Sequence, residues 1–277
     1  MKRIITVFLL AAMLSACVIA FPACSKKKEG TLRVGMECNY PPYNWSQTDD
    51  SNGAVPIKDD VMYAGGYDIE IAKKIADGLG MELQIVKLEW DSLLVSAETG
   101  VIDLIIAGMS PTAERKENID FSDPYYKSEL VMIVKKDGKY TSATSLDDFS
   151  GATIVGQIGT VHDEVIDQIP GVIHKDPMAD FAQMRIALDS GIVDGYIAEK
   201  PEAQSIKNAG LDMVSVEFAA GKGFTVTEEQ VAIAAGIKKG SDELLAKINE
   251  ILAGIKEDER VQIMTKAVEN QPKITKD

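Results

Sequence analysis

An arginine near the middle of the sequence stands in a setting that favours carboxylate binding. In the run Gly108-Met109-Ser110-Pro111-Thr112-Ala113-Glu114-Arg115, Thr112 can cap a helix and place Arg115 in its first turn. Backbone N–H groups at a helix start attract anions, and a guanidinium adds two parallel donors that match a carboxylate. An arginine in a first turn is more often a solvated surface residue. Because this one follows a predicted strand end, a glycine and two hydroxyl residues, we predict that Arg115 binds a carboxylate.

Glu199 can supply the complementary charge. It lies five residues after Asp194, just as Gly108 lies five residues after Asp103, so each follows the C-terminal end of a predicted parallel strand. Ligands in open α/β sheets bind at that edge, which predicts a cleft with Gly108 and Glu199 on opposite walls. Taken alone, Glu199 is equally well interpreted as an exposed glutamate beside Lys200. Together, an arginine and a carboxylate on facing walls fit the two charges of an α-amino acid.

The elements that must position these groups alternate short apolar strands with amphipathic helices. We predict strands over 32–36, 81–88 and 102–107. A helix between the first two strands ends at Gly80 as its C-cap, and Asp91 caps a helix between the second and third. This order predicts a mostly parallel sheet with helices on its faces, that is, an α/β fold.

The same pattern recurs ninety-one residues later. Residues 94–106 read Leu-Val-Ser-Ala-Glu-Thr-Gly-Val-Ile-Asp-Leu-Ile-Ile, and residues 185–197 read Arg-Ile-Ala-Leu-Asp-Ser-Gly-Ile-Val-Asp-Gly-Tyr-Ile. Both segments are a helix end, a glycine, an aspartate and an apolar strand. The unit is common in α/β proteins, so a chance match is an alternative. We interpret the recurrence as two lobes of similar build.

Composition argues against several classes of function. The formal net charge is −14, and a surface of that sign repels nucleic acid and anionic lipid. Cys38 is the single cysteine after the N-terminal segment, and we interpret the two histidines, His162 and His174, as isolated surface or loop residues. We therefore expect no metal site and no cofactor. The sequence offers no nucleophile–base pair and no phosphate loop, so we expect a protein that is not an enzyme.

The N-terminal residues predict export. A basic start precedes an apolar run over residues 4–20, which is typical of a signal peptide rather than of a spanning helix. Cys24 is followed at once by polar residues and is the cysteine we favour for lipid attachment; Cys17, which follows small residues, is the alternative. We expect a signal peptide over 1–23, a tether over 24–30, and an extracytoplasmic body held to the membrane by its lipid alone.

Motifs spread along the chain carry a family resemblance. They are Tyr40-Pro41-Pro42-Tyr43, Gly66-Tyr67-Asp68-Ile69, the run from Gly108 to Arg115, Ile119-Asp120-Phe121-Ser122 with Tyr125-Tyr126, and Gly159-Thr160. Together they resemble the polar amino-acid family of bacterial solute-binding proteins, the receptors of ABC importers. The resemblance covers residues 31–277. It implies a monomeric periplasmic-binding-protein fold whose partners are one amino acid and the importer permease.

The resemblance also implies how the chain divides. Lobe one takes residues 31–132 and 228–277, and lobe two takes 133–227. The chain would cross between the lobes along 130–136 and 224–231, and two such crossings behave as a hinge that ligand closes. Segment 46–64 departs from shorter relatives, and we expect it to form a hairpin or lip on lobe one.

By the same resemblance, the head group of the ligand meets residues from both lobes. Arg115 would bind the α-carboxylate with the backbone N–H groups of Ser110 and of Thr160 or Val161. Relatives often carry a second hydroxyl residue where this chain has Val161. Glu199, the Ser110 hydroxyl and the Gly108 carbonyl would bind the α-ammonium. Family members often have aspartate at the position of Glu199, which is one methylene longer.

Four further residues would select the side chain of the ligand: Glu37, Tyr40, Trp90 and Gln157. The rings of Tyr40 and Trp90 can sandwich an alkyl or cationic chain. Glu37 would face its far end, which favours lysine or arginine first and glutamine second and disfavours glutamate. Two alternatives to a transport receptor are a dehydratase-type enzyme on the same fold and an extracellular sensor module.

Overall fold

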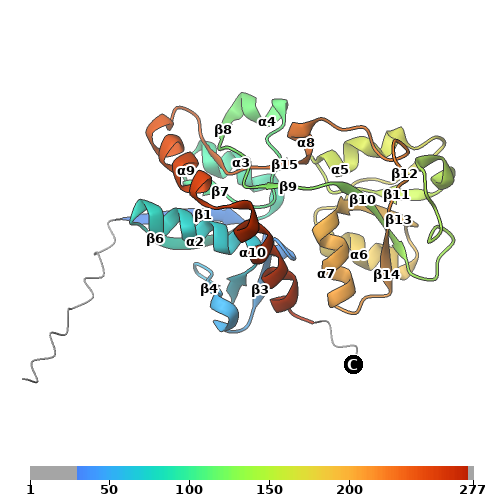
Figure 1. Cartoon of the computed structure of the whole chain (residues 1–277), viewed down its shortest axis with the longest axis horizontal. Helices are drawn as coiled ribbons and strands as arrows, with labels where there is room; N and C mark the ends of the chain where they lie inside the picture. Colours follow the sequence, from blue (N-terminus) through green and yellow to red (C-terminus); the bar gives the residue numbers. More distant parts are fainter. Residues whose placement is uncertain (1–29, 274–277) are drawn as a thin grey trace, which may run out of the picture.

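Two sheets of five strands each form the centres of two lobes that lie side by side (Figure 1). The computed structural model describes residues 30–273. The expected signal peptide, almost all of the tether, and both N-terminal cysteines lie outside the described residues. None of the helices between residues 30 and 273 is long and apolar enough to cross a membrane. The architecture is the predicted α/β arrangement of two lobes.

The sheet of the first lobe is mixed and has the order β6-β1-β7-β16-β8. Its strands are β1 (Thr31–Met36), β6 (Glu82–Lys87), β7 (Leu104–Ile105), β8 (Ile119–Phe121) and β16 (Gly236–Lys238). β1 pairs in parallel with β6 and β7, whereas β16 runs antiparallel to β7 and β8. The strands predicted over 32–36 and 81–88 are confirmed. The strand predicted over 102–107 is shorter than expected, since the ladder pairing of β7 covers two residues.

The larger helices of the first lobe are α2 (Tyr67–Leu79), α3 (Trp90–Glu98), α9 (Asp242–Gly254) and α10 (Glu257–Asn270). The predicted C-cap of α2 is confirmed, because Gly80 has a φ of 68°, a left-handed conformation that glycine adopts at little cost. The prediction that Asp91 caps α3 is wrong. The helix begins at Trp90, two residues earlier than that cap implies, with Glu89 as its N-cap residue. Asp91 lies in its first turn, where a negative charge suits the positive helix end.

The second lobe has a sheet of the order β12-β11-β13-β10-β14. Its strands are β10 (Leu130–Lys135), β11 (Thr153–Val155), β12 (Ile173–His174), β13 (Gly195–Glu199) and β14 (Met213–Val216). Its helices are α5 (Val161–Glu164), α6 (Phe181–Ser190) and α7 (Lys200–Asn208). β11 pairs in parallel with β12 and β13, and β10 runs antiparallel to β13 and β14.

The internal repeat is present in three dimensions. Asp103 precedes β7 in the first lobe and Asp194 precedes β13 in the second. The carboxylate of Asp103 accepts the backbone N–H of Arg33 at 2.8 Å, and that of Asp194 accepts the backbone N–H of Thr153 at 2.8 Å. Each aspartate N–H in turn donates to the carbonyl of the same partner at 2.8 Å. The repeated aspartate therefore ties each strand to its parallel neighbour, which confirms two lobes of similar build.

A short two-stranded sheet lies between the lobes (Figure 1). β9 (Tyr126–Lys127) pairs antiparallel with β15 (Ala232–Ile233), which follows α8 (Glu228–Val231). β10 pairs with β13 from its first residue, Leu130. The strand that we expected to cross between the lobes thus belongs to the second sheet, and the outgoing chain crosses slightly earlier, at β9.

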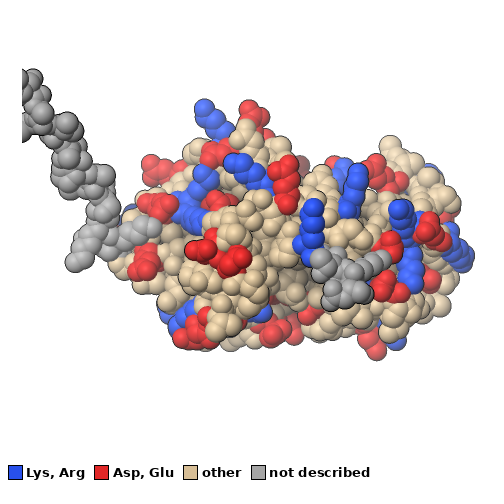
Figure 2. All heavy atoms as spheres, turned by 90° about the horizontal axis from the view of Figure 1, so that it is seen from below, with Lys and Arg blue, Asp and Glu red and all other residues tan. Residues whose placement is uncertain are grey.

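Segment 46–64 forms the expected hairpin on the first lobe. β3 (Asn44–Gln47) pairs antiparallel with β5 (Tyr63–Gly65), in a four-stranded sheet with β2 (Asn39–Tyr40) and β4 (Val55–Pro56). The face shown in Figure 2 carries acidic and basic side chains interspersed over both lobes, without a basic patch.

Candidate functional site

One cavity is lined by residues of both lobes. The lining consists of Tyr40, Trp90, Ala107, Gly108, Ser110, Arg115, Gln157, Thr160, Val161, His162, Glu199 and Gln230. Every predicted binding residue except Glu37 is in this set, and the Gln157 amide donates to the Glu37 carboxylate at 3.0 Å. A larger groove between α2 and α9 lies within the first lobe and contains none of the predicted residues.

Arg115 is held in the cavity by a short helix and two carbonyl groups. Thr112 caps α4 (Ala113–Asn118) by accepting the backbone N–H of Arg115 at 3.4 Å, as predicted. The guanidinium donates to the carbonyls of Ser110, at 2.8 Å, and Gly159, at 2.9 Å. Arg115 is 7% exposed, and burial lowers its pKa to about 10, so it remains charged at neutral pH. Arg115 is therefore a buried cation that contacts the second lobe through Gly159.

Glu199 approaches the cavity from the other lobe. It is the last residue of β13 and the N-cap residue of α7, and it is 4% exposed. One carboxylate oxygen accepts a short hydrogen bond from the Tyr40 hydroxyl, and the other lies 3.1 Å from Nε2 of His162. Burial, with a smaller contribution from Glu202, raises the pKa of Glu199 to about 8. The structure thus places an acidic group and the Arg115 guanidinium in one cavity.

A second acidic group, Glu37, is the hydrogen-bond partner of Gln157, which lines the cavity. The Gln157 amide donates to Glu37 and also to the carbonyl of Ala179, at 3.0 Å each. Burial raises the pKa of Glu37 to about 8, and the negative charges of Asp180, Glu89 and Asp91 add to this effect. The same negative charges would favour a cationic group beside Glu37.

Aromatic rings cover the polar groups of the site. The Trp90 ring lies under the Arg115 guanidinium, 5.1 Å from ring centroid to Cζ. The Tyr40 ring stacks on Phe181 with centroids 3.8 Å apart and planes at 14°. Each of the two predicted aromatic residues therefore has one face against the protein, and the Tyr40 ring also contacts Tyr43, with centroids 5.0 Å apart.

A buried chain of hydrogen bonds holds the backbone at Gly108. The Gly108 N–H donates to the Tyr125 hydroxyl at 3.3 Å, and that hydroxyl donates to the Asp68 carboxylate at 2.9 Å. Asn44 donates to the other Asp68 oxygen at 2.8 Å. Gly108 has a φ of 64°, which a residue with a Cβ adopts only with strain. Two of the sequence motifs, those with Asp68 and Tyr125, thus act together to position Gly108.

Residues of this region that were not predicted from the sequence include His162, Phe181 and Gln230. The interpretation of His162 as a surface or loop residue is wrong, because it is 7% exposed and lines the cavity. Its position in the first turn of α5, after Thr160 and Val161, was the available signal. Phe181 was also missed, although it lies ninety-one residues after Trp90 and would follow from extending the repeat. His174, by contrast, is at the surface, where both ring nitrogens contact carboxylates, of Asp163 and Asp167, at 2.9 Å.

A family comparison agrees with this architecture. Residues 32–269 match the model of the bacterial extracellular solute-binding proteins, family 3. The chain belongs to this family. Among the relatives of this family 3 protein, the L-cystine-binding protein TcyJ of Escherichia coli (strain K12) is 29% identical over 243 residues, covering 86% of this chain and 82% of the relative. The ABC transporter arginine-binding protein 1 of the same strain is 29% identical over 264 residues, covering 93% and 95%.

Solved structures confirm the fold of this family 3 protein. A substrate-binding protein of an amino acid ABC transporter from Streptococcus pneumoniae, bound to L-arginine, has a TM-score of 0.74 at 26% identity and covers 86% of this chain and 94% of its own. An ancestral arginine-binding protein bound to glutamine has a TM-score of 0.70 at 28% identity, with 87% and 99% covered. These relatives are binding proteins, and the family 3 protein is likewise a binding protein rather than an enzyme.

Proposed function

We propose that this solute-binding protein captures a single L-α-amino acid with a cationic or polar side chain, lysine or arginine first and glutamine second. It is an amino-acid-binding protein of an ABC importer. The observation that carries the proposal is the pairing of Arg115 and Glu199, a buried guanidinium and a buried carboxyl group, in one cavity between two lobes.

The head group of the ligand would be shared between the walls. Its carboxylate binds Arg115, the backbone N–H of Ser110 and the backbone N–H of Thr160 or Val161. Its ammonium binds Glu199, the Gly108 carbonyl and the Ser110 hydroxyl oxygen. That hydroxyl donates its own hydrogen to the Gln230 carbonyl at 3.0 Å, so its lone pairs are left to accept. Charge-assisted hydrogen bonds of this kind are about twice as strong as neutral ones.

The preference for a cationic side chain rests on charge. Glu37 faces the cavity end through Gln157, and Asp180, Glu89 and Asp91 act on the same region. A ligand ammonium or guanidinium would favour ionised carboxylates there, and a ligand carboxylate would be repelled. Relatives named for arginine or cystine binding, and solved relatives with L-arginine or glutamine bound, support a ligand of this range.

Ligand capture would involve closure of the lobes, as two groups of residues move about β9 and β15. The division into 31–132 with 228–277 and 133–227 remains a proposal for these moving bodies, except that all of β10, from Leu130, lies in the second sheet and would move with lobe two. A ligand that contacts Arg115 from one lobe and Glu199 from the other stabilises the closed arrangement because the open one offers half of the contacts.

Membrane attachment through Cys24, or alternatively Cys17, remains part of the proposal. Metabolic labelling with a fatty acid should mark the wild-type protein and the Cys17→Ala variant but not Cys24→Ala. Labelling that survives Cys24→Ala and is lost in Cys17→Ala would assign the lipid to Cys17. A wild-type protein that takes up no label would contradict a lipid anchor.

A thermal-shift screen against the twenty amino acids and L-cystine tests the ligand class. A ligand at one hundred times its Kd should raise the free energy of unfolding by about 2.7 kcal/mol. We expect the largest shifts with L-arginine, L-lysine or L-glutamine, followed by calorimetric titration. Tight binding of L-glutamate or L-leucine, with no binding of the three expected ligands, would contradict the proposed specificity.

A further inference from the structure

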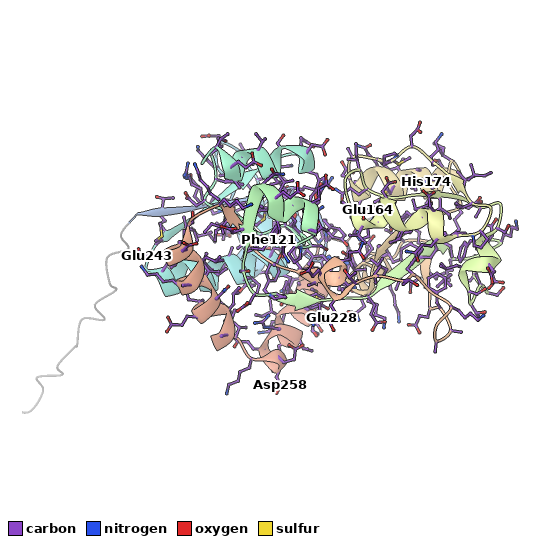
Figure 3. The ribbon with its side chains drawn as sticks, turned by 90° about the horizontal axis from the view of Figure 1, so that it is seen from above. Phe121, Glu164, His174, Glu228, Glu243 and Asp258 are labelled. Carbon is purple, nitrogen blue, oxygen red and sulfur yellow. The ribbon has the colours of Figure 1, made fainter. Side chains whose placement is uncertain are left out.

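His162 is a buried imidazole that the head-group interactions above leave unused. It is the second residue of α5, the helix that Glu164 marks in Figure 3. Its ring meets the Phe181 ring edge-on, with centroids 5.5 Å apart and planes at 86°. The side chain is part of the cavity lining together with Arg115 and Glu199. Because the ring is buried, each of its two nitrogens is expected to have a hydrogen-bond partner.

The hydrogen bonds around Thr160 identify which ring nitrogen carries hydrogen. The Thr160 hydroxyl lies 2.7 Å from the Gln157 carbonyl, which can only accept, so the hydroxyl donates its hydrogen there. The same oxygen lies 3.2 Å from Nδ1 of His162 and must act as the acceptor in that contact. Nδ1 therefore bears the hydrogen, and Nε2 of the neutral ring has a free lone pair.

The neutral form of this ring is the favoured one. Burial, with the positive charge of Arg115, lowers the pKa of His162 to about 3. Nε2 lies 3.1 Å from a carboxylate oxygen of Glu199, but the two atoms are not aligned for a hydrogen bond. Nε2 has no hydrogen-bond partner among residues 30–273. Once Glu199 is ionised, as it would be beside a bound ammonium group, the cavity contains two acceptors side by side, one of them unpaired, and a buried acceptor calls for a donor.

We propose that His162 is a further ligand-binding residue, whose Nε2 accepts a hydrogen bond from the α-ammonium group of the ligand beside Glu199. This inference rests on the proposed function and extends it. An ammonium group has three N–H donors, and His162, Glu199 and the Gly108 carbonyl or Ser110 hydroxyl can each take one. The imidazole thereby makes the site selective for a ligand that retains its α-amino group.

The protonation of His162 and Glu199 depends on the charged and polar groups around them. Tyr40 on β2 donates to one oxygen of Glu199, Arg115 on α4 carries the nearby positive charge, and Glu202 on α7 adds a negative one. Because the pKa of Glu199 lies at about 8, this carboxyl is protonated at neutral pH before ligand arrives. An incoming ammonium keeps its three hydrogens and replaces the Glu199 proton, which leaves to solvent. Binding at pH 7 should therefore release close to one proton from Glu199, in addition to the proton that a cationic ligand side chain releases from Glu37.

A thermodynamic cycle, in which the residue and the ligand are each changed, tests the contact between His162 and the α-ammonium group. The probes are L-arginine and its analogue with hydrogen in place of the α-amino group, titrated by calorimetry into the wild-type protein, His162→Leu and His162→Gln. We expect His162→Leu to weaken L-arginine binding about tenfold or more, which is the weight of one hydrogen bond to a charged group. The analogue should lose less than about threefold. His162→Gln keeps an acceptor and should stay within about threefold of wild type for L-arginine.

Equal losses of both probes in His162→Leu would overturn the inference, since packing alone would produce them. A measurement without variants guards against misfolding: ¹⁵N NMR of the wild-type complex should show neutral His162 with hydrogen on Nδ1, and protonated or Nε2–H forms would contradict the contact. Should L-arginine not bind, L-lysine and L-glutamine carry the same head group and replace it. Binding of none of the three by wild type would overturn the proposed function and this inference with it.

Discussion

Trp90 and Phe181 hold equivalent places in the two lobes and perform related tasks. Each is the first residue of its helix, α3 or α6, and they are ninety-one residues apart. Trp90 covers the Arg115 guanidinium at 5.1 Å, and Phe181 stacks on Tyr40, which holds Glu199. Each copy of the internal repeat thus supplies one aromatic ring. Trp90 supports the Arg115 guanidinium, and Phe181 supports Glu199 through Tyr40.

Replacing Trp90 by Leu should weaken amino-acid binding without unfolding the protein. The substitution removes a cation–π contact of about 0.5–2 kcal/mol that orients Arg115, so we expect a loss of roughly 2- to 30-fold in affinity by calorimetry. Trp90→Phe, which keeps an aromatic face, is the matched control and should lose less. If the two variants bind equally well, Trp90 acts only as a spacer.

Arg115→Ala should abolish the ligand-induced thermal shift while leaving the ligand-free protein folded. The variant loses the donors for the ligand carboxylate, and removing a buried cation need not cost stability. Arg115→Lys keeps the charge but not the two parallel donors, so its shift should be intermediate. A full shift in Arg115→Ala would mean that the carboxylate binds elsewhere.

The ligand-free protein should lose stability as the pH rises from about 5 to 8. Glu37 and Glu199 have pKa values raised from 4.5 to about 8 by burial. In this window the folded state binds more protons than the unfolded state, so the free energy of unfolding falls with pH, by on the order of 1 kcal/mol per pH unit for each carboxyl group. Urea unfolding at pH 5, 6.5 and 8 measures this slope.

The control for that slope is the pair of variants Glu37→Gln and Glu199→Gln, each of which should flatten it. A saturating cationic amino acid should flatten it as well, because ionised carboxylates then gain a partner. Stability that rises between pH 5 and 8 in the wild-type protein would contradict the buried, protonated state of these two groups.

Glu37→Gln should change which amino acid binds best. Loss of the acidic group at the cavity end should weaken L-arginine or L-lysine by about tenfold, a typical cost of losing one charge partner, and L-glutamine by less than about threefold. Glu89→Gln is the matched comparison: its charge also acts on Glu37, but Glu89 is exposed and screened by solvent, so the loss should be smaller. Equal effects of both variants on all three ligands would remove Glu37 from the specificity site.

Closure about β9 and β15 should be visible in solution. The described arrangement brings Arg115 to Gly159, and Tyr40 to both Glu199 and Phe181, across the two lobes. Small-angle X-ray scattering should therefore give a smaller radius of gyration with saturating ligand than without. Superimposable curves would rule out a hinge motion of the proposed size.

The sequence by itself determined the features that depend on near neighbours. Thr112 and Arg115 are three residues apart, so a capping preference places the guanidinium in a first helical turn. The apolar face of α2 follows from helical periodicity, and its end at Gly80 follows from the preference for glycine at a helix C-terminus. The repeated aspartates predict the strand ends that bear Gly108 and Glu199. Local preference does not fix the start of α3, since Glu89 and Asp91 both suit a helix N-terminus.

Tertiary structure alone decided the contacts between distant parts of the chain. Gln157 meets Glu37 across 120 positions of sequence, and Tyr40 meets Glu199 across 159. The burial of His162 follows from the same docking of the lobes, since its first-turn position is compatible with solvent as well as with a cavity. Local propensities act over a few residues, whereas burial and the resulting pKa shifts depend on which surfaces the completed fold brings together.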